Sequence, residues 1–125
     1  MICRYLGHAS VVCETQDQTF AFDPHYGIGD VFGWAWRFIP QPIAADPMQI
    51  HPVVLSHHHQ DHVDHAFLED ARGVGCEVII PADRPLLRAA VERHVRKDDI
   101  TEISPSTGGG GAQTVSFTLP ASVAA

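Results

Sequence analysis

Basic side chains and long apolar runs are both scarce in this chain of 125 residues. Lys and Arg together number 8 against 15 Asp and Glu, which gives a formal net charge of −7. Binding to a phosphate backbone depends on Lys and Arg, so we expect no nucleic acid among the partners. A membrane-spanning helix needs about 18 consecutive apolar residues, and because no stretch approaches that length we expect no membrane span. The acid surplus is compatible with cation capture, and equally with solubility alone.

Cysteine is also sparse, and Cys3, Cys13 and Cys76 lie far apart in the sequence. An odd number of cysteines without a C-x-x-C pair excludes the disulfide framework of a small secreted domain. We interpret all three as small buried hydrophobic residues in a reducing compartment. The N-terminal "MICRYLG" lacks the basic start and apolar run of a signal peptide, so we expect a cytoplasmic location.

Short β-forming runs alternate with amphipathic stretches along the chain. The runs "ICRYLG", "SVVCET" and "TFAFD" predict a three-stranded meander, and "PVVLS", "CEVIIP" and "DITEIS" predict three further strands. Between these, "HAFLEDAR" predicts a helix capped by Asp64 and ended by Gly73, and "ADRPLLRAAVERHV" predicts a helix capped by Asp83. The apolar face of the second helix is expected to comprise Leu86, Leu87, Ala90, Val91 and Val95. This alternation favours an α/β fold.

Two stretches carry no regular pattern. Residues 24–52 contain five prolines, which exclude a long helix, and five aromatic residues, which argue against disorder. This loop either forms a wall or lid of a substrate pocket or covers the edge of the sheet. Residues 107–113 form a Gly-rich turn that no Lys-Ser or Lys-Thr follows, so a phosphate-binding loop is excluded. We expect residues 1–125 to belong to a single domain.

The most distinctive stretch is "SHHHQDHVDH", which directly follows the strand-like "VVL". Alternate side chains of an extended segment share a face, so His57 and His59 can grip one metal ion. Asp61 and His62 follow where the chain turns, and they can point to a second position close by. Imidazole and carboxylate ligands suit Zn²⁺, and also Fe or Mn. A solvated loop or a tag-like tract is the alternative, but this tract is internal and interleaved with Asp.

Two further histidines, His58 within this pattern and His65 after it, are not among the predicted ligands. His58 alternates with the proposed ligands and faces away from them, so we interpret it as a bystander. His65 lies one helical turn after His62 and could be a ligand, a supporting partner or a surface histidine.

The tract "SHHHQDHVD" after "PVVL" resembles the metal motif of the metallo-β-lactamase superfamily. Upstream, "YLGHASVVCE" followed by "TFAFDP" is similar to the start of the branch that includes N-acyl-phosphatidylethanolamine phospholipase D and L-ascorbate-6-phosphate lactonase. The resemblance covers residues 4 to about 96. It implies an α/β fold, the N-terminal half of an αββα sandwich, in which a mixed β-sheet carries helices on one face.

The resemblance also implies roles for the residues of the motif. His57 and His59 would bind the first of two Zn²⁺ ions, with Fe or Mn as possible substitutes, and Asp61 and His62 would bind the second. Asp61 would also orient the bridging water as the catalytic residue. A metal-bound hydroxide would then attack an ester, lactone or phosphodiester in a small-molecule or lipid-like substrate. The predicted function is therefore that of a metal-dependent hydrolase.

Two upstream residues have counterparts in the same branch. Asp23, at the end of the third predicted strand, resembles a residue that supports the metal loop by contacting its ligands. His8 resembles the histidine of the family's L-G-H-A stretch, for which we expect a structural or pocket-lining role.

The family completes its site with a third histidine, a bridging aspartate and a last histidine beyond the matched region. No histidine follows His94 in this sequence. We therefore expect a truncated domain, whose half-sandwich exposes an apolar sheet face that self-associates. The alternatives to a hydrolase are a non-catalytic metal-binding or interaction fragment, and a degenerate fragment without a function of its own.

Overall fold

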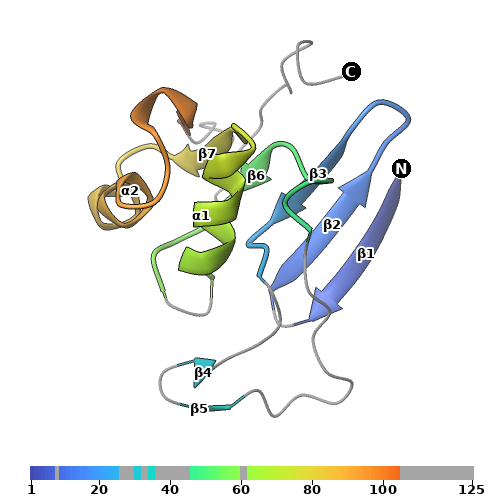
Figure 1. Cartoon of the computed structure of the whole chain (residues 1–125), viewed down its shortest axis with the longest axis horizontal. Coiled ribbons are helices and arrows are strands. Elements are labelled where there is room, and N and C mark those ends of the chain that lie inside the picture. Colours follow the sequence, from blue (N-terminus) through green and yellow to red (C-terminus); the bar gives the residue numbers. More distant parts are fainter. Residues whose placement is uncertain (8, 26–29, 32–33, 36–45, 60–61, 105–125) are drawn as a thin grey trace, which may run out of the picture.

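The computed structural model describes residues 1–7, 9–25, 30–31, 34–35, 46–59 and 62–104. Its main feature is a mixed sheet of six strands in the order β1-β2-β3-β6-β7-β8 (Figure 1). These strands are β1 (Ile2–Gly7), β2 (Ser10–Glu14), β3 (Thr19–Phe22), β6 (Val53–Val54), β7 (Val78–Pro81) and β8 (Ile100–Ile103). The other elements are α1 (His65–Gly73), α2 (Pro85–Glu92), a 3-10 turn at Lys97–Asp99, and a separate pair of strands, β4 (Asp30–Val31) and β5 (Trp34–Ala35). The predicted α/β class is confirmed.

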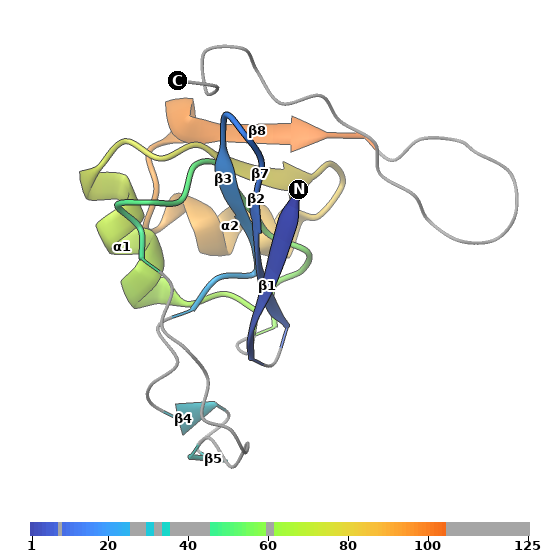
Figure 2. The same cartoon turned by 90° about the vertical axis from the view of Figure 1, so that its right-hand side faces the viewer.

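The sheet has an antiparallel half and a parallel half. β1, β2 and β3 pair in antiparallel fashion, because short turns connect them. β3, β6, β7 and β8 are parallel to one another. α1 forms the crossover from β6 to β7 and α2 the crossover from β7 to β8, whereas the long segment with β4 and β5 connects β3 to β6 (Figure 2). As a result, β3 and β6 end side by side at the same edge of the sheet.

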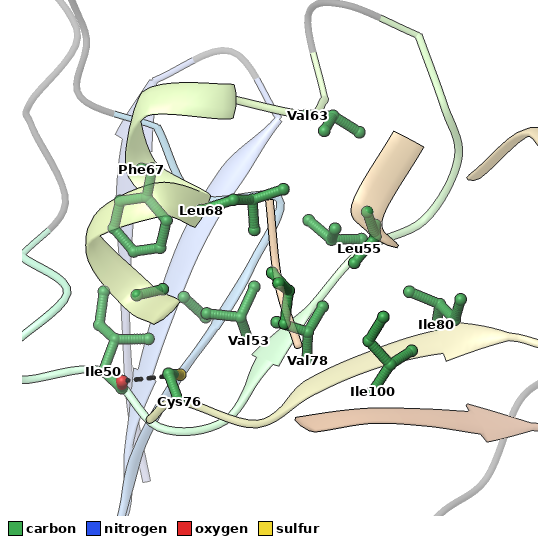
Figure 3. Close-up of a cluster of buried hydrophobic side chains, with 14 of the residues drawn as sticks. Ile50, Val53, Leu55, Val63, Phe67, Leu68, Cys76, Val78, Ile80 and Ile100 are labelled. Atoms are coloured by element: carbon green, nitrogen blue, oxygen red, sulfur yellow. Dashed lines mark hydrogen bonds between the residues drawn. The ribbon is translucent and has the colours of Figure 1, made fainter. Parts of the chain in front are cut away.

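The core lies between the two helices and one face of this sheet. In-register residues of five strands face the helices and are buried: Val12, Ala21, Val53, Val78 and Ile100. α1 covers them with Phe67 and Leu68 (Figure 3) and with Ala71, and α2 covers them with Leu87 and Val91. In the described part of the chain both helices therefore pack on the same face, as the sequence predicts. This packing anchors β6 and with it the segment that follows.

The signals at the ends of α1 behave largely as predicted. Asp64 is the N-cap, and its carboxylate accepts a hydrogen bond from the Phe67 amide at 3.2 Å. Gly73 is the last helical residue rather than the residue that ends the helix. The reversal comes at Gly75, whose φ of 69° is a conformation that glycine adopts without steric cost.

The start of α2 differs from the prediction. The N-cap is Arg84, which makes no side-chain capping bond, so the prediction of an Asp83 cap is wrong. Pro85 at the first helical position disfavours helical backbone in the residue before it, which places the boundary at Arg84. The helix ends at Glu92, and Leu86 is 63% exposed instead of belonging to the apolar face. Val95 is buried although it lies beyond the helix end.

The long segment 24–52 is less irregular than predicted, because β4 and β5 pair within it. The Gly-rich turn predicted at 107–113 lies outside the described residues. Among the residues that are described, no helix has the length and apolar character needed to cross a membrane.

Candidate metal centre

The predicted ligands that the structure describes, His57, His59 and His62, follow the point where two neighbouring parallel strands end. Asp23 directly follows β3, and the stretch 56–62 begins two residues after β6. Because these strands pair in parallel register, with Phe22 opposite Val54, their carboxyl ends bring the two segments together. The carboxyl ends of parallel strands are the usual place for ligand sites in open α/β sheets.

Asp23 fixes the beginning of the histidine segment. Its amide donates to the Val54 carbonyl at 2.9 Å, which extends the contact between the two strands by one residue. Its φ of 44° is unusual for a residue other than glycine, although Asp tolerates it better than most. The buried carboxylate accepts hydrogen bonds from the Ser56 amide at 2.8 Å and from the Ser56 hydroxyl at 2.6 Å. These bonds set the direction in which the chain leaves β6.

Three imidazoles cluster beyond this anchor. The ring centroid of His57 lies 3.9 Å from that of His62 and 4.5 Å from that of His59. The clustering arises because the chain turns back on itself, with the His59 carbonyl accepting hydrogen bonds from the amides of His62 and Val63. The structure therefore brings together the three predicted histidine ligands that it describes. Asp61, predicted as a ligand and as the catalytic residue, lies outside the described residues, as does His8.

The hydrogen bonds around Asp23 determine which ring nitrogens carry protons. Nδ1 of His62 lies 2.8 Å from Oδ2 of Asp23, so this nitrogen is the donor to the carboxylate. Ser56 has a single hydroxyl proton, which it donates to Asp23. The Ser56 oxygen lies 2.9 Å from Nδ1 of His57, and because its own proton is already used it accepts a hydrogen bond from Nδ1–H of His57. In the neutral form of each ring, Nε2 then carries the lone pair. A histidine binds a metal in this form, with its other nitrogen held by a hydrogen-bond partner.

The three imidazoles suit a Zn²⁺ or Fe ion, for which imidazole nitrogen is a preferred ligand, whereas Mn would depend more on carboxylate oxygens. The rings contact one another, however, and a Zn–N bond is about 2.0–2.1 Å long, so the side chains must rotate apart to converge on an ion. Accordingly, no group of three or more His, Cys, Asp or Glu side chains within the described ranges already has the arrangement of a metal site.

The remaining two histidines of residues 56–65, His58 and His65, are not among the predicted ligands. His58 is exposed, and its ring packs edge-on against the His59 ring at a centroid distance of 5.1 Å. His65 stacks on His94 with a centroid distance of 4.5 Å, and Nδ1 of His94 lies 2.7 Å from Glu69. Burial, and then the neighbouring His94, lower the pKa of His65 below its usual value. Of the three roles open to His65, its exposure and its contact with His94 fit that of a surface histidine.

Ser56 is the residue that sequence reasoning missed. It connects the Asp23 carboxylate to the His57 ring, and its oxygen also lies 3.5 Å from Nδ1 of His62. The sequence offered one indication of this role, since Ser56 is a hydroxyl residue between a buried strand and the first predicted ligand. A side chain in that position can form a supporting hydrogen bond to a ligand histidine.

One cavity of about 380 Å³ opens elsewhere on the molecule. It is lined by residues 15–19 and by Met48, Gln49 and His51, at the turn between β2 and β3. This turn lies at the opposite end of β3 from Asp23. The cavity is therefore not part of the histidine cluster.

No model of a known protein family matches this chain, and none of the curated proteins compared with it is significantly similar.

Proposed function

We propose that this chain carries the metal-binding half of a metal-dependent hydrolase of the metallo-β-lactamase superfamily. The observation that carries the proposal is the cluster of His57, His59 and His62, with His62 held by Asp23 at the carboxyl ends of β3 and β6. Further support comes from the mixed sheet with both described helices on one face, which suits the N-terminal half of an αββα sandwich.

Each residue has a defined task in this proposal. His57 and His59 would hold one metal ion, and Asp61 and His62 a second. Asp23 keeps a proton on Nδ1 of His62, and Ser56 keeps one on Nδ1 of His57, so both rings are presented in their metal-binding form. A catalytic zinc ion commonly has three protein ligands, so the first ion needs a further ligand besides His57 and His59.

The proposed reaction is hydrolysis of an ester, a lactone or a phosphodiester. When bound, the metal ions supply Lewis acidity and lower the pKa of water to near neutrality. The chain's own contribution is to orient the ligands before the ion arrives, because the bonds from Asp23 already fix the start of the histidine segment. Such supporting contacts to metal ligands commonly change affinity by about 10–100-fold.

A second candidate function is that of a non-catalytic metal-binding or interaction fragment. It is favoured by the sheet face that points away from α1 and α2. On this face Tyr5 is 66% exposed and Phe22 is 37% exposed, although both are large and apolar. Contiguous exposed apolar surface commonly marks an interaction site, which here would allow self-association. Size-exclusion chromatography with light scattering tests this candidate, and a soluble monomer at high concentration would count against it.

Metal content is the experiment that tests the proposed function. Untagged protein, purified without chelator, should contain about one or two metal ions per chain by plasma mass spectrometry. The double variant His57→Ala/His59→Ala should lose most of this metal, since two imidazoles are removed. His58→Ala is the matched control, because it removes an adjacent exposed histidine and should leave the metal content unchanged. Metal retained in full by the double variant would overturn the assignment.

A further inference from the structure

Two cysteine thiols face each other across the N-terminal hairpin. Cys3 of β1 and Cys13 of β2 are direct partners in the antiparallel register. Their sulfur atoms are 3.2 Å apart, and both residues are free thiols. The interpretation of all three cysteines as buried is wrong for Cys3, which is exposed. The alternation of β1 places its side chain on the sheet face that points away from the helices.

The backbone of this pair already suits a disulfide. Directly opposed residues of antiparallel strands have Cα atoms about 4.5–5.5 Å apart. This separation falls within the range of about 4.4–6.8 Å found in disulfides. Closing the bond between Cys3 and Cys13 therefore needs rotation of the side chains and no movement of the strands.

The two thiols are not equivalent. Cys3 is exposed, whereas Cys13 is only 5% exposed. Burial, together with the hydrogen bond to Cys3, raises the pKa of the Cys13 thiol to about 11. A protonated buried thiol reacts poorly, because the thiolate is the nucleophile. Cys3 is consequently the thiol that meets a reagent from solvent, and Cys13 is placed to resolve the product.

We propose that Cys3 and Cys13 form a redox-sensitive dithiol site that takes a low-molecular-weight disulfide as its oxidant. In the first step the Cys3 thiolate attacks one sulfur of the reagent, which forms a mixed disulfide and releases one thiolate. In the second step Cys13 gives its proton to solvent and attacks the Cys3 sulfur, which closes the Cys3–Cys13 bond and releases the second thiolate. The two cysteines lose two electrons and two protons, and the reagent is reduced to two thiols.

Oxidation would tie the edge strand to the body of the sheet. β1 is the outermost strand, so the new bond would hold it to β2 covalently. In the sheet, Cys13 lies opposite Phe20, near the start of β3, whereas Asp23 follows the end of that strand. Oxidation of Cys3 and Cys13 would therefore restrain the edge strand β1, at a distance from the histidine cluster. It does not depend on the proposed hydrolase activity.

Cys76 provides an internal comparison. It is buried, and its thiol donates to the Ile50 carbonyl at 3.4 Å (Figure 3). Burial raises its pKa to about 12. Because Cys76 is 1% exposed and belongs to the hydrophobic core, it should remain a thiol under conditions that oxidise Cys3 and Cys13.

The test treats the native full chain with oxidised glutathione, quenches it with acid, alkylates the remaining thiols and digests with trypsin. Cleavage after Arg4 and Arg37 places Cys3 in peptide 1–4 and Cys13 in peptide 5–37. We expect these two peptides to be joined by a disulfide, and the number of free thiols to fall from three to one and to recover with dithiothreitol. Three remaining thiols, or links between separate chains only, would overturn the proposal.

Two variants separate the roles within the pair. Cys13→Ser should accumulate a stable mixed disulfide between glutathione and Cys3, because no thiol is present to displace it. Cys3→Ser should react at least about tenfold more slowly, since the remaining thiols are buried and protonated. A wild-type protein that stops at the same mixed disulfide as Cys13→Ser would show that Cys13 does not resolve it, and would also overturn the proposal.

Discussion

Oδ2 of Asp23 lies 2.8 Å from Nδ1 of His62, a residue 39 positions further along the chain. The same carboxylate holds the amide and the hydroxyl of Ser56, so one side chain joins both ends of the histidine segment to β3. A buried carboxylate with three donors is satisfied, and it orients those donors in return. Asp23 thus orients His62 directly and His57 through Ser56.

Replacing Asp23 tests this dependence. Asp23→Asn keeps the size of the side chain but replaces one of the two carboxylate oxygens with an NH₂ group. The three donors, the Ser56 amide, the Ser56 hydroxyl and Nδ1 of His62, then share a single oxygen acceptor. At least one hydrogen bond is therefore replaced by an unfavourable contact between two donors. We expect metal affinity to fall by about 10–100-fold, and the free energy of unfolding to fall by about 1–3 kcal/mol. Isothermal titration with Zn²⁺ and urea denaturation measure the two effects. Asp17→Asn, at an exposed turn position, is the control and should change neither quantity.

Replacing Ser56 tests the assignment of the His57 proton. Ser56→Ala removes the acceptor of the proton on Nδ1 of His57. Because this imidazole is then no longer held in the tautomer with a free Nε2 lone pair, Zn²⁺ affinity should fall about tenfold or more. Ser56→Thr retains the hydroxyl and should keep affinity within about threefold of the wild type. Equal affinity of the two variants would contradict the role that we assign to the hydroxyl.

The stacked pair on the helices predicts a dependence of stability on pH. The pKa of His65 is lowered from its usual value of 6.5, first by burial and then by His94, while Arg93 acts in the same direction and Asp64 opposes it. The unfolded chain therefore takes up this proton at a higher pH than the folded chain does. Stability should be full above pH 6.5 and should decline as the pH falls from 6.5 toward the folded-state pKa.

Urea denaturation between pH 5 and pH 8, in the presence of chelator, measures this effect within about the range where histidine titrates. His65→Gln should flatten the decline, because the group that titrates is gone. His58→Gln serves as the control, since it changes an exposed histidine outside the pair, and it should retain the wild-type slope. A slope that survives in His65→Gln would contradict the assignment of the effect to His65.

The core predicts a large difference between two apolar residues of the helices. Phe67 of α1 is fully buried against the sheet, so Phe67→Ala should lower the free energy of unfolding by about 3–5 kcal/mol. Leu86 of α2 points to solvent, and Leu86→Ala should change it by no more than about 0.5 kcal/mol. Comparable losses for the two variants would mean that Leu86 is covered in solution. Both values come from urea denaturation of the full chain.

Sequence patterns predicted the elements better than the contacts between them. The β-forming runs "SVVCET" and "TFAFD" and the Asp64 cap are local signals, and the strands and α1 formed where these signals lie. The Asp83 cap failed because the constraint that Pro85 imposes on its predecessor outweighs the capping preference. Local signals cannot reveal strand register, and for this reason the facing of Cys3 and Cys13 was missed.

The candidate site shows the same division. The spacing of His57, His59 and His62 predicted that these rings would gather, because all three lie within six consecutive residues and their positions depend on local backbone geometry. The role of Ser56 depends on a carboxylate that arrives from a different strand, so it became visible only once β3 and β6 were seen as parallel neighbours. The left-handed backbone of Asp23 likewise has no signature in the sequence.

Because β3 pairs with the chain around β6, the two ends of the connection between them are held close together, so that the connection could be replaced by another one. Backbone hydrogen bonds join His51 to Thr19, Ala21 to Pro52 and Asp23 to Val54, at 2.8, 3.2 and 2.9 Å, so both ends are fastened before the histidine segment begins. Doubling the length of a flexible connection costs only about 0.6 kcal/mol. We therefore expect that connections of other lengths and compositions can be grafted between these fastened ends while the hydrogen bonds from Ser56 and His62 to Asp23 are kept.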